Sequence, residues 1–119
     1  MASSNREPWP FEPAVREAVE LLARGEYGAL EQRSGGVRLS ADELRDAVRA
    51  YGRRVVAPPR EAAPPLDVVA VAGAEPPEWS VAVPLWTAEE GRSDLTLELT
   101  VRAAPGGAYA IELDNVHVL

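Results

Sequence analysis

Apolar residues in the first half of the chain recur with the spacing of an α-helix. Pro13 suits the first turn of a helix, and Gly25 suits the position just after its last turn. The pattern predicts a helix over residues 13–24 and a shorter helical segment over residues 26–32. The apolar face of the first helix consists of four residues spaced three or four apart: Val15, Ala18, Val19 and Leu22.

The segment that begins at Ser40 carries the clearest helix signal. Glu43 follows three positions later and completes a capping box, in which the serine oxygen accepts from the Glu43 backbone N–H and the Glu43 carboxylate accepts from the Ser40 backbone N–H. Gly52 closes the segment with a residue that readily adopts the left-handed conformation. We therefore expect a helix over residues 40–52, with an apolar side made of Leu44, Ala47, Val48 and Tyr51.

After a proline-rich connector at residues 57–65, the hydrophobic period changes from that of a helix to that of a strand. Each proline in the connector removes a backbone donor and fixes φ, which excludes regular structure there. Pro84 indicates an edge position or a bulge. Pro105-Gly106-Gly107 predicts a hairpin turn. About four strands are expected, at residues 66–72, 79–86, 94–102 and 109–114.

The strand at residues 94–102 alternates most regularly. Its leucines should face the core, and the residues between them should face water. The inward set is Leu95, Leu97 and Leu99, and the outward set is Thr96, Glu98 and Thr100.

These elements together predict an α+β fold, in which N-terminal helices pack on a curved antiparallel sheet. Residues 13–119 are expected to form a single domain, and residues 1–12 an N-terminal arm. Trp9 and Phe11 belong to that arm and should fold back onto the core, because two aromatic rings are costly to leave in water.

Composition narrows the classes of function. The chain has 119 residues, of which 46% are apolar, with no cysteine and a single histidine, His117. The lack of cysteine excludes disulfides, thiolate nucleophiles and cysteine zinc sites, and we expect neither a metal nor a cofactor. A net charge of −7 disfavours nucleic acid as a partner. No apolar run reaches membrane-spanning length and no signal-peptide pattern opens the chain, so a cytoplasmic protein is expected.

Two stretches of the chain resemble known families. The order "ARGEYGAL", then the capped helix "SADELRDAVRAYG", then a meander of strands resembles the nuclear transport factor 2-like, or cystatin-like, superfamily. That resemblance implies a cone-shaped fold in which helices and sheet often enclose a pocket. The segment "PLWTAEEGRSDLTLELTV…YAIELDNVHVL", residues 84–119, resembles the C-terminal signature of an uncharacterised bacterial domain family, which implies no particular activity.

The connector after the strand at residues 79–86 is the most polar stretch and the first candidate binding site. It holds three carboxylates, a guanidinium and an adjacent indole, which exceeds what a simple turn requires. A self-contained turn, with the arginine paired to its neighbouring carboxylates, remains the alternative. The candidate binding residues are Trp86, Glu89, Glu90, Arg92 and Asp94.

Asp94, Asp114 and His117 are the candidate catalytic residues. An aspartate beside a histidine orients the imidazole in many acid–base sites. At three residues apart on a straight strand Asp114 and His117 point to opposite faces, so pairing would need a bulge at Asn115.

Three classes of function remain open. The first is a small acidic binding domain for a protein partner, such as a toxin-neutralising immunity protein or an accessory subunit. The second is a small enzyme of the dehydratase, isomerase or hydrolase type found in nuclear transport factor 2-like folds, with a small-molecule ligand in a pocket between helices and sheet. The third is a homodimer that packs sheet against sheet.

Overall fold

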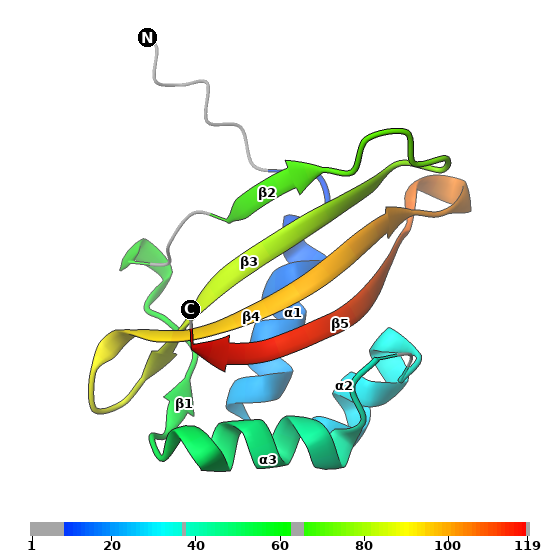
Figure 1. Ribbon diagram of the computed structural model, residues 1–119. Coiled ribbons are helices and arrows are strands. Elements are labelled where there is room, and N and C mark those ends of the chain that lie inside the picture. The colour runs from blue at the N-terminus through cyan, green and yellow to red at the C-terminus, as the bar shows by residue number, and fades with distance from the viewer. Residues whose placement is uncertain (1–8, 37, 63–65, 119) are drawn as a thin grey trace, which may run out of the picture.

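A computed structural model describes residues 9–36, 38–62 and 66–118, and Figure 1 shows three helices beside a twisted antiparallel sheet. The helices precede the main strands in the chain, so the predicted α+β class is confirmed. Residues 1–8 of the predicted arm and residues 63–65 of the connector lie outside the described residues. No helix in the described part is long and apolar enough to cross a membrane.

Helix α1, Glu12–Ala23, begins one residue before Pro13 and buries the four predicted apolar residues against the sheet. Phe11, just before the helix, is fully buried, whereas Trp9 stays 41% exposed. The Phe11 ring packs against Trp79, at 5.1 Å between ring centroids, and against Tyr109, at 5.8 Å. Phe11 therefore belongs to the core rather than to a loose arm.

Helix α3, Ala41–Tyr51, ends as the sequence predicts, because Gly52 takes the left-handed conformation. Helix α2, Tyr27–Ser34, runs two residues past the predicted end at residue 32 and stops where Gly35 takes the left-handed conformation. Both halves of the capping box are present at Ser40: its oxygen accepts from the Glu43 N–H at 3.1 Å, and the Glu43 carboxylate accepts from the Ser40 N–H at 2.9 Å. Only Leu44 of the predicted apolar side of α3 is fully buried. Helix α3 lies against the margin of the core rather than across it (Figure 1).

The sheet has five strands rather than about four, in the order β1-β3-β4-β5, with β2 also paired to β3. The sequence did not indicate β1, because it is only two residues long and directly precedes the prolines. The strands are β1 Val55–Val56, β2 Asp67–Ala70, β3 Glu78–Thr87, β4 Gly91–Ala103 and β5 Tyr109–Val118. The proline-rich connector was expected to hold no regular structure, but Arg60–Ala62 forms a turn of 3-10 helix, because these three residues include no proline. Another 3-10 turn at Pro105–Gly107 joins β4 to β5.

The inner face of the sheet packs against α1 and forms the core. The predicted leucines of β4 are at most 2% exposed, and the alternating positions of the two neighbouring strands are buried with them. Thr96 differs from the expectation: it is only 4% exposed although it points outward. Its cross-strand neighbours are Pro84 on β3 and His117 on β5, and these flank the threonine on the outer side.

Two irregularities shape the outer face. The β3–β4 register shifts between Pro84 and Trp86, which confirms a bulge beside the proline. The β4–β5 register shifts where Leu99 pairs with Leu113 and Glu98 pairs with Asn115, so Asp114 is the extra residue. Because of this second bulge, Asp114 and His117 both face outward, and the opposite-face expectation for a straight strand does not apply.

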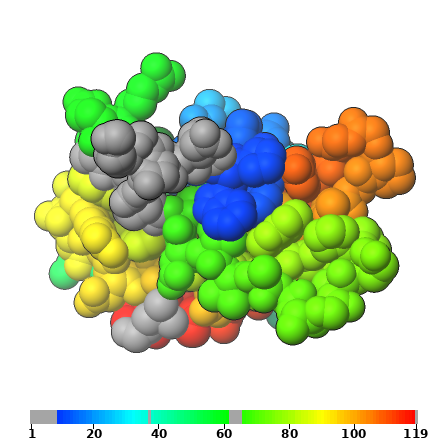
Figure 2. Space-filling model, turned by 90° about the horizontal axis from the view of Figure 1, so that it is seen from above, coloured from blue at the N-terminus to red at the C-terminus, as the bar shows by residue number. Residues whose placement is uncertain are grey.

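The outer face has no helix over it among the described residues (Figure 1). Strand β2 borders this face; Val69 within it is 62% exposed, and Val71 just after it is 40% exposed. In Figure 2, seen from above, the β3–β4 turn (yellow) and the β4–β5 turn (orange) lie at opposite ends of the molecule, with β2 (green) between them.

Candidate functional site

The β3–β4 turn, predicted as a binding loop, is tied to the C-terminal end of α3. The Tyr51 hydroxyl lies 2.9 and 3.0 Å from the two carboxylate oxygens of Glu90, to which it donates. The Thr87 hydroxyl also donates to Glu90 and accepts from the Glu90 N–H, both at 3.0 Å. Burial of the Tyr51 hydroxyl, followed by its hydrogen bond to Glu90, raises the pKa of Tyr51 above its ordinary value.

The Glu89 carboxylate is also held by a hydrogen bond to another part of the chain. Its carboxylate accepts from the backbone N–H of Arg54 at 3.0 Å, and the Ala88 N–H donates to the Arg54 carbonyl at 2.8 Å. The hydrogen bond from Arg54 is the main reason why the pKa of Glu89 lies below its ordinary value. Two of the three loop carboxylates therefore fasten the turn to neighbouring parts of the chain, Glu90 to α3 and Glu89 to the segment that precedes β1.

The remaining loop residues lie on or beside the outer face. The Trp86 ring packs over Gly91: a Cβ built at Gly91 would lie 3.6 Å from the ring. The indole nitrogen is buried and has no hydrogen-bond partner among the described residues. Arg92 and Asp94 are exposed, and neither forms an ion pair within the described ranges, unlike the arginine–carboxylate pairing of a self-contained turn.

The candidate catalytic residues have separate partners. Asp114 accepts from the Thr100 hydroxyl at 2.7 Å and lies 3.3 Å from Arg38, which belongs to the segment between α2 and α3. His117 Nε2 lies 3.0 Å from Glu98 Oε1, although the nitrogen is not aligned for a hydrogen bond. Asp94 lies further along β4. The structure thus brings all three to the outer face without forming an aspartate–histidine pair.

The outer face is hollowed along β3. Two hollows of about 280 and 520 Å³ adjoin each other and share Asp67 and Ala82 in their walls. Their floor consists of the short outward side chains of Ser80, Ala82 and Pro84. We call these two hollows together the outer groove.

Carboxylates dominate the walls of the outer groove. Asp67 on β2 lines both hollows, Glu98 and Asp114 line the first, and Asp94 lines the second. Arg92 is the one cation among the described residues of these walls. Asp67 and Asp94 have no ion-pair partner in the part of the chain that the structure describes, whereas Asp114 faces Arg38 and Glu98 lies beside His117. The groove therefore presents an excess of negative charge beside the exposed Val69 of β2.

The far end of the same face is neutralised internally. Arg102 donates to Glu78 at 2.7 Å and to Glu112 at 3.2 Å. The hydrogen bond to Glu78, followed by that to Glu112, raises the pKa of Arg102. The uncompensated negative charge is therefore concentrated along the groove rather than spread over the whole face.

Sequence reasoning identified Arg92 and Asp94 but missed Asp67, Ser80 and Ala82 as parts of a site. The available signal was the run of small residues at alternate positions of β3. Their importance depends on the β2–β3 register, in which Ala82 lies opposite Asp67.

Two further observations concern where a catalytic residue or a metal ion could be placed. A separate cavity lies between α1 and β3, and Asp94, Asp114 and His117 are absent from its described lining. No cluster of three or more histidine, aspartate or glutamate residues suited to hold a metal ion occurs among the described residues.

Comparison with known proteins gives a family without an assigned activity. No curated protein matches the chain, and no solved structure matches it either. A family model described as "Domain of unknown function (DUF7668)" matches residues 19–119, which include the second half of α1, both other helices and the entire sheet. The chain therefore belongs to this uncharacterised domain family.

Proposed function

We propose that this protein is a binding domain that docks a basic segment of a partner protein in the outer groove. The observation that carries the proposal is an open sheet face whose groove has four carboxylates and one guanidinium in its described walls. Charge complementarity steers association and selects partners, and the net charge of −7 acts in the same direction.

The groove also favours side chains with an apolar stem. Its floor is small and partly apolar, and Val69 lines it beside Asp67. Lysine and arginine bury their methylene stems along such surfaces while their charged ends reach carboxylates. A segment that alternates cationic and apolar side chains matches this arrangement.

The alternatives have less support. Two copies packed outer face to outer face would oppose like charges along their grooves, which disfavours a sheet-against-sheet homodimer. A nuclear transport factor 2-like enzyme would need an acid or base inside the helix–sheet cavity. The three residues predicted for that role, Asp94, Asp114 and His117, lie on the other side of the sheet. Glu20 is the one carboxylate in the described wall of the cavity, and it lies 3.9 Å from Arg24. Immunity protein and accessory subunit both remain compatible with the proposal, and the identity of the partner distinguishes them.

The test compares two double variants of equal charge. Asp67→Asn/Glu98→Gln removes two carboxylates from the groove, and Glu26→Gln/Asp46→Asn removes two carboxylates from the helical side, outside the groove. The probe is a short peptide rich in lysine, arginine and leucine, and a second peptide with glutamate in place of each cation serves as its control. Affinities are measured by fluorescence anisotropy at low and moderate salt.

We expect the groove variant to bind the basic peptide between roughly 2-fold and 30-fold more weakly than wild type, from ~0.2–1 kcal/mol for each exposed charge pair. The helical variant should bind like wild type, and added salt should reduce the difference. Equal weakening by both variants would mean that net charge alone attracts the peptide, and would refute the groove as the docking site.

A further inference from the structure

The cavity between α1 and β3 lies at a gap in the edge of the sheet. Strand β1 pairs with Trp86 and Thr87, and β2 pairs with positions 79–82, so no described strand covers Val83–Leu85 on that side of β3. Pro84 lies in the middle of the gap and has no N–H to leave unsatisfied. A cavity of about 410 Å³ opens there between β3, α1 and a linking segment of which Ala57, Pro58, Arg60 and Leu66 are the described lining residues.

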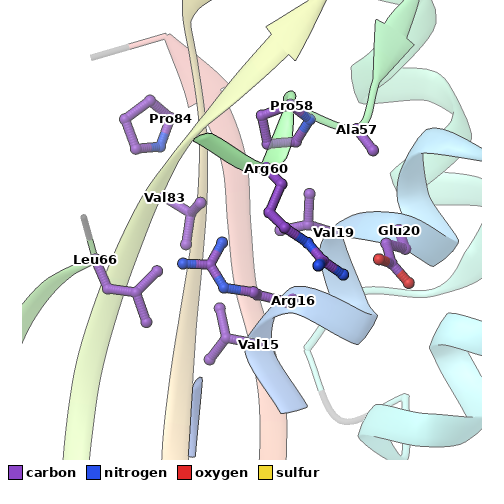
Figure 3. Close-up of a pocket in the computed structure, with 10 residues that line it drawn as sticks. All are labelled: Val15, Arg16, Val19, Glu20, Ala57, Pro58, Arg60, Leu66, Val83 and Pro84. Carbon is purple, nitrogen blue, oxygen red and sulfur yellow. The ribbon is translucent and has the colours of Figure 1, made fainter. Parts of the chain in front are cut away.

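The wall of this cavity is mainly apolar. Figure 3 shows the aliphatic side chains around a common space, with contributions from the helix, the strand and the linking segment. Cavities that bind small ligands are typically about 300–1,000 Å³ and mostly apolar, with a few polar groups that fix the ligand. Besides Ala57, the apolar lining residues are Val15, Val19, Pro58, Leu66, Val83 and Pro84.

Two guanidinium groups provide the polar part. In Figure 3, Arg16 on α1 extends toward Val83 and Leu66, and Arg60 in the linking segment extends toward α1 on the side of Glu20. Arg16 donates to Glu12 at 3.0 Å through one nitrogen, which leaves most of its five donors unused. Arg60 has no ion pair among the described residues, and Glu20, the one carboxylate in the described wall, is 3.9 Å from Arg24.

We propose that this cavity binds a small apolar monocarboxylate, with the carboxylate held by Arg16 and Arg60 and the hydrocarbon body packed against the valines. Guanidinium groups bind carboxylates through paired, charge-assisted hydrogen bonds. Both arginines are accessible from solvent, since Arg60 is exposed and the Arg16 side chain is 43% exposed, so a carboxylate can reach their free donors. The charged groups of this cavity are not those of the outer groove, so the two sites can be tested independently.

Octanoate is the probe, measured by titration calorimetry against the whole chain. Octanamide retains the hydrocarbon body without the charge, and acetate retains the charge without the body. We expect octanoate to bind roughly tenfold or more tightly than either analogue, because charge-assisted hydrogen bonds and apolar burial each contribute. Equal binding of octanamide would refute the role of the arginines, and equal binding of acetate would refute the apolar class of ligand.

Variants then locate the site. Arg16→Gln/Arg60→Gln should weaken octanoate roughly tenfold or more. The matched variant is Arg49→Gln/Arg53→Gln, which removes two exposed arginines at the end of α3 and just after it, outside the cavity, and it should bind like wild type. Circular dichroism checks that each variant is folded. Wild-type affinity in the folded double variant, or no octanoate binding by wild type, would overturn the proposal.

Discussion

Phe11→Ala is the most informative test of how the N-terminal residues contribute to the fold. Phe11 is fully buried, although it lies eight positions before the first residue matched by the family model. Its ring packs against Trp79 and Tyr109 on the inner face of the sheet. The family match alone would assign Phe11 to an extension, whereas the structure assigns it to the core.

The expected loss follows from this packing. Burial of a phenylalanine side chain contributes about 1.5–3 kcal/mol by transfer from water, and each aromatic pair adds about 0.5–1.5 kcal/mol. The alanine variant also leaves a cavity, and Phe→Ala changes in cores typically cost about 3–5 kcal/mol. We expect the free energy of unfolding to fall by about 3–5 kcal/mol.

Urea denaturation followed by tryptophan fluorescence measures this loss, and Trp79 reports on the site directly. With a slope of about 2 kcal/mol per molar urea, the midpoint should fall by roughly 2 M while the slope stays constant. Trp9→Ala is the control: Trp9 is 41% exposed, so its loss should be clearly smaller. A loss below about 1 kcal/mol for Phe11→Ala would refute the assignment of this ring to the core.

Three further substitutions test other parts of the molecule. Ser40→Ala should lower the free energy of unfolding by about 1 kcal/mol, measured by urea denaturation, because the cap of α3 is lost. Leu97→Ala should cost about 2–5 kcal/mol in the same assay, whereas Val118→Ala, at a position 53% exposed, should stay within about 0.5 kcal/mol of wild type. Glu89→Gln tests pH dependence: the Arg54 hydrogen bond lowers the pKa of this carboxyl below 4.5, so its contribution is present above pH 4.5 and is lost as the pH falls through the lowered value. Acid-dependent melting should therefore change less below pH 4.5 in Glu89→Gln than in wild type, and an unchanged profile would count against the Glu89–Arg54 contact.

The sequence predicted most helices and strands well, because helix capping and strand alternation depend on residues that are close together in the chain. The capping box at Ser40 and Glu43 depends on residues three positions apart, and it forms as expected. The alternation of β4 likewise fixes which leucines are buried, since side chains alternate between the two faces of a strand. Strand β1 was missed because two residues carry no periodicity, and it exists only through pairing with distant Thr87 and Trp86.

The candidate site depends on long-range register, which the sequence does not encode locally. One extra residue at Asp114 places Asp114 and His117 on the same face, and parity on a straight strand predicts the opposite. Glu90 looked available for binding, but Tyr51, 39 positions away, holds it. The outer groove exists because β2 places Asp67 opposite Ala82, a pairing that no spacing within either strand indicates.

Docking of a basic segment in the outer groove is tested most directly by mapping where a bound probe lies. Isotope-labelled protein is titrated with the lysine-, arginine- and leucine-rich peptide, and the amide chemical shifts are followed. We expect saturable shifts concentrated at Asp67, Ser80, Ala82 and Glu98, and none with the glutamate peptide. Shifts confined to the exposed faces of α1 and α3, or no saturable shift at all, would contradict docking in the groove.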